Sequence, residues 1–280
     1  AEGNVLQTIF FAIVFGIGLA IVKENGEDHI QKGATMIFDF VETAAEVMFK
    51  IVWGVMEYGV IGVFALMAGV FAESGLDVIV PFSKLIGGLL LAVIVHITVV
   101  YLLIIVGGFL KRSPMSFLSG AKDAMLTALS IRSSSGTLPV TMRNAEENLK
   151  IDESIYSFTL PLGATINMDG TAMYQGVAAI FAANLIGQTL TIGQQMTVIL
   201  TATLASVGTA GVPGSGLIML TMVLTQLGLP LEVVGFVAGI DPILDRLRTM
   251  NNVTGDLAVT SLVAKFNDGI DLDNGVWKKK

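Results

Sequence analysis

The sequence predicts an all-α protein that crosses a membrane several times. Of its 280 residues, 53% are hydrophobic and only 14% are charged, and the mean hydropathy is +0.76. Soluble globular domains carry about 25% charged residues, so an ordinary soluble protein is excluded, and disordered chains are far less hydrophobic than this one. Long apolar segments recur along the chain, which is typical of a polytopic helical membrane protein. We therefore expect a multi-pass protein of a cell membrane, either plasma or inner.

Three further observations exclude classes of function. The chain has no cysteine, so disulfides and thiolate metal sites are excluded. Its two histidines, His29 and His96, lie far apart, which argues against a histidine-based metal centre, and we expect no cofactor. The net charge of −7 argues against a nucleic-acid partner, because such a partner requires a basic face. The chain begins at Ala1 rather than at a methionine, so we expect a fragment or a processed product.

The sequence predicts four helical segments in the first part of the chain. Residues 5–22 are apolar and just long enough to cross a bilayer. Residues 30–56 are amphipathic and predict a helix at an interface or against partner helices. Residues 58–71 are apolar, with two glycines that predict a bend. Residues 78–110 form a strong spanning segment, long enough to be tilted.

Two later segments predict re-entrant helical hairpins, at about residues 114–150 and about residues 191–229. Each hairpin has two arms, and each arm is too short to cross about 30 Å of hydrocarbon at a rise of about 1.5 Å per residue. The arms flank a polar tip at residues 132–136 in the first hairpin and a glycine-rich tip at residues 207–216 in the second. The first tip is either an anion-binding turn or a simple polar turn. The second is either a mobile gate or a loop on the outer surface.

An interrupted span follows each hairpin. Residues 152–186 are broken by a polar sequence at 167–171, and residues 231–266 carry charges in their middle. Hairpin, broken span, hairpin and charged span form a two-fold repeat, and the two hairpins would enter the membrane from opposite sides as inverted repeats. Because lipid cannot satisfy the backbone groups that a helix break frees, paired breaks of this kind indicate a transporter binding site.

The last span carries one narrow polar stripe. Asp241, Asp245, Arg248, Asn252 and Asp256 are spaced by 4, 3, 4 and 4 residues, so at about 100° per residue they share a stripe roughly 80° wide. The flanking residues are largely apolar, which predicts that the stripe faces a protein interior or an aqueous cavity. Ionisable residues within a span cost several kcal/mol each and usually serve function.

Two interpretations of the stripe stay open. One is an internal salt bridge between Asp245 and Arg248, which would merely neutralise both groups. The other uses the surplus carboxylates to bind cations and the arginine to bind a carboxylate in bidentate geometry. Asp169 in the broken span, with Asn167 and Thr171 nearby, adds oxygen ligands that suit a hard cation such as Na⁺. Alternatively, Asp169 only caps the helix that follows it.

Four ordered motifs resemble the signature segments of the glutamate/aspartate transporters, the dicarboxylate/amino acid:cation symporter family. They are RSSSGTLP at residues 132–139, NMDGT at 167–171, GTAGVPG at 208–214 and DRLRTMNNVTGD at 245–256. The resemblance covers the whole chain but only the later part of the family pattern. The first three spanning helices of that pattern, and the early part of the fourth, precede the matched part.

The resemblance implies the glutamate transporter homologue fold, assembled as a homotrimer in the bilayer. Residues 1–75 would form part of the scaffold and trimerisation helices. Residues 76–280 would form a transport domain that contains the two re-entrant hairpins and the two interrupted spans. The resemblance also implies elevator-type alternating access, in which the transport domain is the mobile part.

The resemblance further implies which residues bind the substrate and sodium. Arg248 would bind the side-chain carboxylate of the substrate, and Asp245 its amino group. The other substrate contacts would come from polar side chains and from the two tips: Ser134, Thr171, Val212, Gly216, Thr249 and Asn252. Three sodium sites are implied, namely Asp256 with backbone oxygens of Gly163, Asn167 and Asn252; then Thr165, Ser206, Val207 and Thr209; and then Asp169 with Asn167.

These features together predict a sodium-coupled secondary active symporter for L-aspartate or L-glutamate. Within the family, an arginine at position 248 favours acidic substrates, Asp245 favours a substrate with an ammonium group, and Asp169 and Asp256 favour Na⁺ over H⁺ coupling. Two alternatives remain, a proton-coupled C4-dicarboxylate carrier and an anion channel on the same scaffold. An enzyme is not expected, because the sequence offers no nucleophile–base pair and no metal-ligand set.

Overall fold

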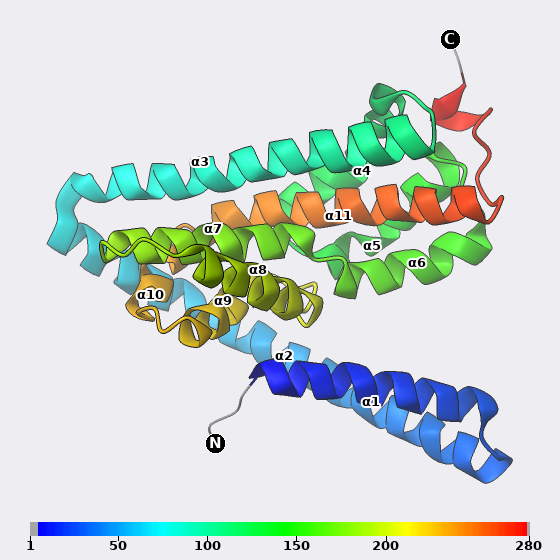
Figure 1. Ribbon diagram of the computed structural model, residues 1–280, viewed down its shortest axis with the longest axis horizontal. Helices are drawn as coiled ribbons and strands as arrows, with labels where there is room; N and C mark the ends of the chain where they lie inside the picture. Colours follow the sequence, from blue (N-terminus) through cyan, green and yellow to red (C-terminus); the bar gives the residue numbers. More distant parts are fainter. Residues whose placement is uncertain (1–4, 279–280) are drawn as a thin grey trace. The chain divides into compact units, whose positions relative to one another are not determined.

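The computed structural model describes residues 5–278 and is almost entirely helical (Figure 1). Within that range, the only β pairing is an isolated antiparallel bridge between Ile151 and Ile270. The predicted all-α fold class is therefore confirmed. The chain divides into two compact units, residues 1–66 and residues 67–280, each of which is described by itself.

The first unit contains α1 (Val5–Asn25) and most of α2 (Asp28–Ser74). The two segments predicted for this region form one helix of 47 residues, so the expected bend does not divide it. A glycine inside a helix costs only about 1 kcal/mol relative to alanine and keeps its backbone hydrogen bond. Large apolar side chains of α2 face outward, among them Phe40, Tyr58 and Phe64, each at least 73% exposed. Such a surface is expected where a helix contacts lipid or a partner.

The second unit contains a long apolar helix. It is built from a 3₁₀ turn, η1 (Gly75–Val78), followed by α3 (Ile79–His96) and a π-helical stretch, η2 (Ile97–Phe109). These 35 residues reach a mean hydropathy of 3.0, and among the described residues they form the one helix that is long and apolar enough to cross a membrane alone. This helix corresponds to the span predicted at residues 78–110.

The rest of the second unit is a series of shorter helices separated by breaks. In chain order they are α4 (Pro114–Ile131), α5 (Ser134–Arg143), η3 (Asn144–Asn148), α6 (Glu153–Ile166), α7 (Asp169–Leu185), α8 (Ile192–Val207), α9 (Ser215–Gln226), α10 (Glu232–Ala238), α11 (Asp241–Phe266) and η4 (Gly275–Trp277). The breaks between α4 and α5, between α6 and α7 and between α8 and α9 fall at predicted interruptions. The last predicted span is broken at residues 239–240, before the charged stripe, so the stripe lies on an unbroken helix. The re-entrant placement of the pairs α4–α5 and α8–α9 in the bilayer remains a prediction.

Local sequence explains how the two tips form. α4 ends where Arg132 adopts a left-handed conformation, with φ at 58°. The hydroxyl of Ser133 then caps α5 by accepting the N–H of Gly136 at 2.9 Å, which satisfies one of the free donors of a helix start. In the second tip, α9 begins after Gly214, whose φ of 78° is accessible to glycine without steric cost.

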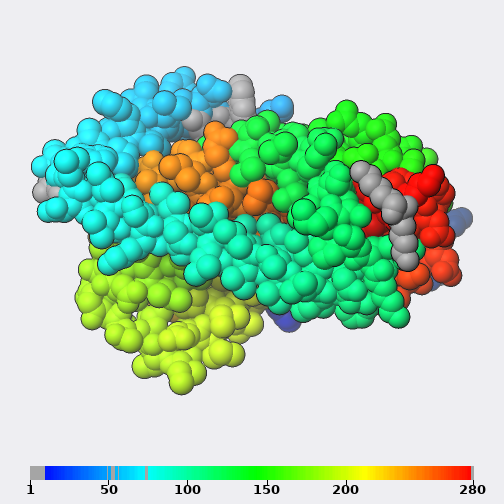
Figure 2. Space-filling model, turned by 90° about the horizontal axis from the view of Figure 1, so that it is seen from above, coloured from blue at the N-terminus to red at the C-terminus, as the bar shows by residue number. Residues whose placement is uncertain are grey.

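Helix α11 lies at the centre of the second unit. It packs against α3, η2, α4, α5, α6 and α7, and Figure 1 shows it between α3 on one side and α7 and α6 on the other. In Figure 2 its orange first turns are visible only in part between cyan and green neighbours. A helix so enclosed presents its polar side chains to protein rather than to lipid, and α11 therefore positions the site.

Candidate functional site

The polar stripe of α11 faces the interior of the second unit. Its five members, Asp241, Asp245, Arg248, Asn252 and Asp256, are each at most 5% exposed. The prediction that the stripe faces a protein interior is therefore confirmed. Burying a charged group costs several kcal/mol unless partners compensate it, so the partners of these side chains define the site.

Two carboxylates hold the guanidinium of Arg248. Asp241 accepts from Nη1 at 2.8 Å and from Nη2 at 3.4 Å, and Asp245 accepts from Nε at 2.9 Å. The salt bridge to Asp245 that the sequence left open is therefore present, and Asp241 extends it. These pairs use the Nε–H and one N–H of each terminal nitrogen, so each terminal nitrogen keeps a second N–H. The guanidinium is thus fixed in place and can still donate to a further carboxylate.

An aromatic ring and a glycine enclose the same guanidinium. The Cζ atom of Arg248 lies 4.5 Å from the centroid of the Tyr174 ring on α7, which is a cation–π contact. Gly216 on α9 approaches so closely that a β-carbon there would lie 2.7 Å from Cζ. Because two ion pairs hold the guanidinium, it cannot move aside at low cost, and position 216 therefore requires glycine.

Replacing Gly216 by alanine is expected to weaken binding of the predicted substrate, L-aspartate, by about ten-fold, since overpacking a tight site costs typically about 1–3 kcal/mol. The added methyl group would displace the guanidinium from its paired position. Calorimetric titration measures the effect. Gly176→Ala is the matched control, because a β-carbon at Gly176 meets no atom within 4 Å. Equal affinities of the two variants would contradict the close approach of α9 to the arginine.

The two tips contact each other and α11. The hydroxyl of Ser133 donates to the carbonyl of Gly211 at 2.7 Å, and the N–H of Ser135 donates to the same carbonyl at 3.2 Å. The N–H of Gly214 donates to the Oδ2 atom of Asp245 at 3.1 Å. The second tip is therefore an interior element rather than a surface loop, and both tips belong to one site.

Four segments enclose a small cavity. Its lining comes from the first tip, the break between α6 and α7, the second tip and α11, and comprises Arg132, Ser134, Met168, Thr171, Ala210, Gly211, Val212, Ser215, Asp245, Arg248, Thr249 and Asn252. Seven of the eight predicted substrate-binding residues line it, and the eighth, Gly216, contacts Arg248. The cavity measures about 10 Å³, roughly the room for one water molecule. An amino acid can therefore enter only if a tip moves.

A second cluster surrounds Asp256 on α11. Asn167, in the break between α6 and α7, donates from Nδ2 to the Oδ1 atom of Asp256 at 3.0 Å and to the carbonyl of Asn252 at 3.4 Å. Gly163 on α6 approaches so closely that a β-carbon there would lie 2.6 Å from the Oδ1 atom of Asp256. The structure thus brings together the residues of the first predicted sodium site. Their carboxylate, amide and carbonyl oxygens are ligands that hard cations prefer.

A third cluster surrounds Asp169 at the start of α7. Its carboxylate contacts Nε2 of His96 at 2.8 Å, the hydroxyl of Tyr101, and Nδ2 of Asn251 at 2.9 Å. The rings of His96 and Tyr101 meet edge to face, with centroids 4.9 Å apart. The carboxylate also accepts the N–H of the next residue at 2.9 Å, but Met168 occupies the cap position of α7 and no side-chain cap is present there, so Asp169 does not cap the helix. Asn167, the other member of this predicted sodium site, donates to the second cluster instead.

The remaining predicted sodium ligands are less closely grouped. Ser206 and Thr209, at the end of α8, are buried, and their hydroxyls donate to carbonyls of nearby residues in the same segment. Val207 is the last residue of α8, where backbone carbonyls lack helical partners. Thr165 on α6 is exposed and donates to the carbonyl of Leu162 at 2.8 Å. Among the described residues, no hydrogen bond joins Thr165 to the other three.

The chain matches a known family over nearly its whole length. The family described as the sodium:dicarboxylate symporter family matches residues 1–266. The chain belongs to this family. The predicted resemblance to the glutamate/aspartate transporters is therefore confirmed, as is the predicted multi-pass placement in a cell membrane. The sodium:dicarboxylate symporters are transporters, as the sequence predicted.

Three relatives show the extent of the similarity. Excitatory amino acid transporter 3 of Mus musculus is 40% identical over 273 residues, which cover 94% of this chain and 49% of that protein. Excitatory amino acid transporter 2 of Homo sapiens is 41% identical over 257 residues, covering 90% and 43%. An excitatory amino acid transporter of Caenorhabditis elegans is 38% identical over 276 residues, covering 96% and 52%. The chain thus spans about half the length of the curated relatives it matches.

Several residues that build the site have no role assigned from the sequence. Asp241 lies on the predicted stripe but has no assigned role, although its position two helical turns before Arg248 places both on one face. Tyr174 follows Thr171 by three residues on α7, so helical spacing could have identified it. Tyr101 has no such signal, because it lies 68 residues from its partner Asp169 and only the fold brings the two together.

Proposed function

We propose that this chain forms the substrate- and sodium-binding part of a sodium-coupled symporter for acidic amino acids. The observation that carries the proposal is the buried guanidinium of Arg248, which Asp241 and Asp245 hold at the wall of a small cavity. An arginine fixed in this way keeps one N–H on each terminal nitrogen, and each of them can donate to a carboxylate of the substrate. Its position is set before the substrate arrives, so little ordering cost remains on binding.

Each polar group of the substrate is bound by different residues of the cavity. Arg248 binds the side-chain carboxylate of aspartate or glutamate, and Asp245 binds the ammonium group. Ser134 and the backbone of Val212 and Gly216, in the two tips, serve the α-carboxylate. Further polar contacts come from Thr171, Thr249 and Asn252. Asp245 already accepts from Arg248 and from the N–H of Gly214, and an ammonium group adds a further charge-assisted hydrogen bond that a plain dicarboxylate cannot make, so amino acids are preferred.

Sodium coupling follows from the charges of the interior. Asp241 and Asp245 pair with the guanidinium of Arg248, whereas the buried Asp256 accepts from the amide of Asn167 and the partly buried Asp169 contacts His96. Surplus negative charge in a low-dielectric interior requires cations. We assign Na⁺ to the predicted ligands: Asp256 with Gly163, Asn167 and Asn252; Asp169 with Asn167; and Thr165 with Ser206, Val207 and Thr209. Bound Na⁺ offsets the carboxylates and so strengthens binding of an anionic substrate.

Access to the site requires movement of a tip, because the cavity is too small for an amino acid. We further propose elevator-type alternating access in a homotrimer, with residues 1–75 as part of the scaffold and residues 76–280 as the transport domain. The family resemblance supports this assignment. Polar side chains concentrate around one small cavity rather than along a continuous path, which favours a carrier over an anion channel.

Titration of L-aspartate at a series of Na⁺ concentrations tests the proposed function. Affinity is expected to rise steeply with Na⁺ at fixed pH and constant ionic strength, with choline replacing Na⁺. The rise reflects linkage, in which each cation raises the affinity for the substrate and the substrate raises the affinity for the cation equally. An aspartate affinity that does not change with the Na⁺ concentration contradicts the proposal. An affinity that follows pH instead favours the proton-coupled C4-dicarboxylate carrier.

A further inference from the structure

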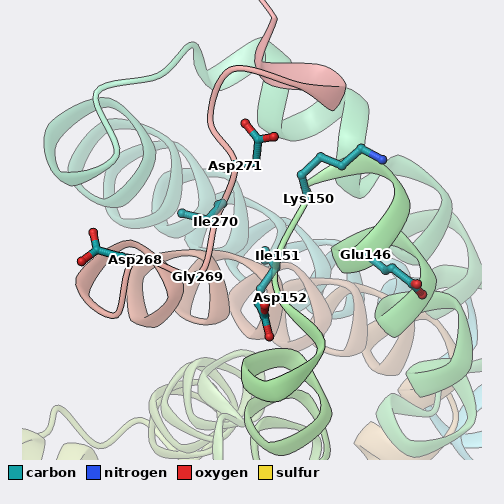
Figure 3. Close-up of a pocket in the computed structure, with 8 residues that line it drawn as sticks. All are labelled: Glu146, Lys150, Ile151, Asp152, Asp268, Gly269, Ile270 and Asp271. Carbon is teal, nitrogen blue, oxygen red and sulfur yellow. The ribbon is translucent and has the colours of Figure 1, made fainter.

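The segment that follows α11 folds back onto the base of the first helix pair. We call residues 267–277 the C-terminal strap, and α4, α5 and η3 together the first hairpin. The N–H of Asp152 donates to the carbonyl of Gly269 at 2.8 Å, and the N–H of Asp271 donates to the carbonyl of Lys150 at 2.9 Å. Figure 3 shows the strap alongside residues 150–152, where the two segments line an open pocket of about 400 Å³.

Trp277 anchors the far end of the strap. It is 3% exposed, and its indole Nε1–H donates to the carbonyl of Leu149 at 2.8 Å. Burying a tryptophan and satisfying its N–H at the same time gives both packing and orientation. Just before it, Gly275 has a φ of 61° and lies directly against the carbonyl of Asn148, an approach that a β-carbon would prevent.

The strap also reaches the other end of the first hairpin. Arg112, two residues before α4, donates from Nε to the carbonyl of Leu272 at 3.2 Å and pairs through Nη2 with Asp273 at 3.3 Å. Within the strap, the amide of Asn274 donates to the carboxylate of Asp271. Both ends of the first hairpin and the end of α11 are therefore joined by one short segment.

Hydrogen bonds tie the two arms of the first hairpin together near its base. The side-chain amides of Asn144 and Asn148 both donate to the carbonyl of Gly120. Gly120 and Asn144 lie twelve residues either side of Arg132, so the two arms run antiparallel from a joined base. Each arm spans only about 18 Å at about 1.5 Å per residue. The tip therefore lies only a short distance from the joined base.

We propose that the C-terminal strap is a positioning element for the binding site, and that Trp277 is its anchoring residue. By tying both ends of the first hairpin to the end of α11, the strap holds the tip that carries Ser134 against the helix that carries Arg248. The strap contacts neither substrate nor sodium ligand itself, and it acts through the hairpin. This inference rests on the proposed function only where it concerns affinity for the substrate.

Hydrogen exchange resolved by peptide, on the whole chain without substrate, tests the inference. Trp277→Ala is expected to speed hydrogen exchange in peptides that cover the first tip, residues 128–137, by about ten-fold or more. Without the indole the base of the first hairpin is no longer held, and its two arms can open locally. Trp277→Phe retains the packing but lacks the indole donor, and a smaller increase is expected. Asp268→Asn, an exposed change within the strap, is the matched control, and its exchange should equal that of the unmodified chain.

Affinity supplies the second readout. Trp277→Ala is expected to weaken L-aspartate binding by about ten-fold while leaving Na⁺ binding in the absence of substrate unchanged, because the sodium ligands lie outside the first hairpin. Faster exchange confined to residues 149–152 and 267–277, with the tip unchanged, overturns the inference and leaves the strap a local stabilising element. If Trp277→Ala does not fold, Trp277→Phe decides. Failure of the unmodified chain to bind aspartate contradicts the proposed function, and the exchange result still decides the role of the strap.

Discussion

Replacing Arg248 by cysteine is expected to lower the affinity for L-aspartate by about 1000-fold, which corresponds to about 4 kcal/mol. The variant loses the group that binds the side-chain carboxylate, and it leaves Asp241 and Asp245 buried side by side without their shared partner. Without the guanidinium, the negative charge at these two side chains repels an anionic ligand. Calorimetric titration in saturating Na⁺ measures the loss.

Two further variants separate the effect on binding from an effect on folding. Arg248→Lys keeps the positive charge but lacks the planar fork that pairs with a carboxylate, so an intermediate loss is expected with the fold retained. Arg143→Cys is the matched control, because Arg143 is exposed at the end of α5 and lies outside the cavity lining. Aspartate binding that survives Arg248→Cys at its original strength would show that the substrate lies elsewhere.

Replacing Asp256 by asparagine is expected to raise the Na⁺ concentration needed for half-maximal aspartate binding by about ten-fold or more, since removing one charged ligand costs several kcal/mol at a buried cation site. The amide keeps the size of the side chain, so the close approach of Gly163 is undisturbed. Aspartate affinity in saturating Na⁺ is expected to change much less. Aspartate titrations across a Na⁺ series measure both quantities.

Asp152→Asn is the charge-matched control for Asp256→Asn. Asp152 lies at the start of α6, where the hydroxyl and N–H of Ser154 hydrogen-bond to its carboxylate and lower its pKa. The substitution removes one negative charge outside the cavity, so the dependence of aspartate affinity on Na⁺ concentration should match that of the unmodified chain. Equal Na⁺ dependence in the two variants would remove Asp256 from the sodium site.

Most of the site could be predicted from the sequence because its chemistry is concentrated in helix breaks and on one helix face. A polar stripe such as Asp245, Arg248 and Asn252 in an apolar helix has only one low-energy orientation, toward protein. The breaks that carry Ser134 and Val212 are marked by local glycine, serine and proline residues, whose backbone preferences act without distant contacts.

Other features could not be predicted because they depend on contacts between distant residues. The carboxylate of Asp169 meets His96 and Tyr101 only after the long helix of α3 and η2 packs beside the start of α7. The strap has no periodic pattern of apolar residues. Trp277 hydrogen-bonds to the carbonyl of Leu149, which lies 128 residues earlier in the sequence. The two glycines that predict a bend do not interrupt α2, because glycine permits a turn but does not require one.

The central claim is that one buried site recognises both a carboxylate and an ammonium group, and does so only with Na⁺. The most direct measurement is a calorimetric titration of the unmodified chain with L-aspartate, L-glutamate and succinate, each with Na⁺ and with choline in its place. The account predicts that aspartate and glutamate bind in Na⁺ alone, and that succinate binds about 100-fold more weakly, since it offers Asp245 no ammonium partner. Succinate binding as tightly as aspartate, or binding that is the same in choline, would contradict it.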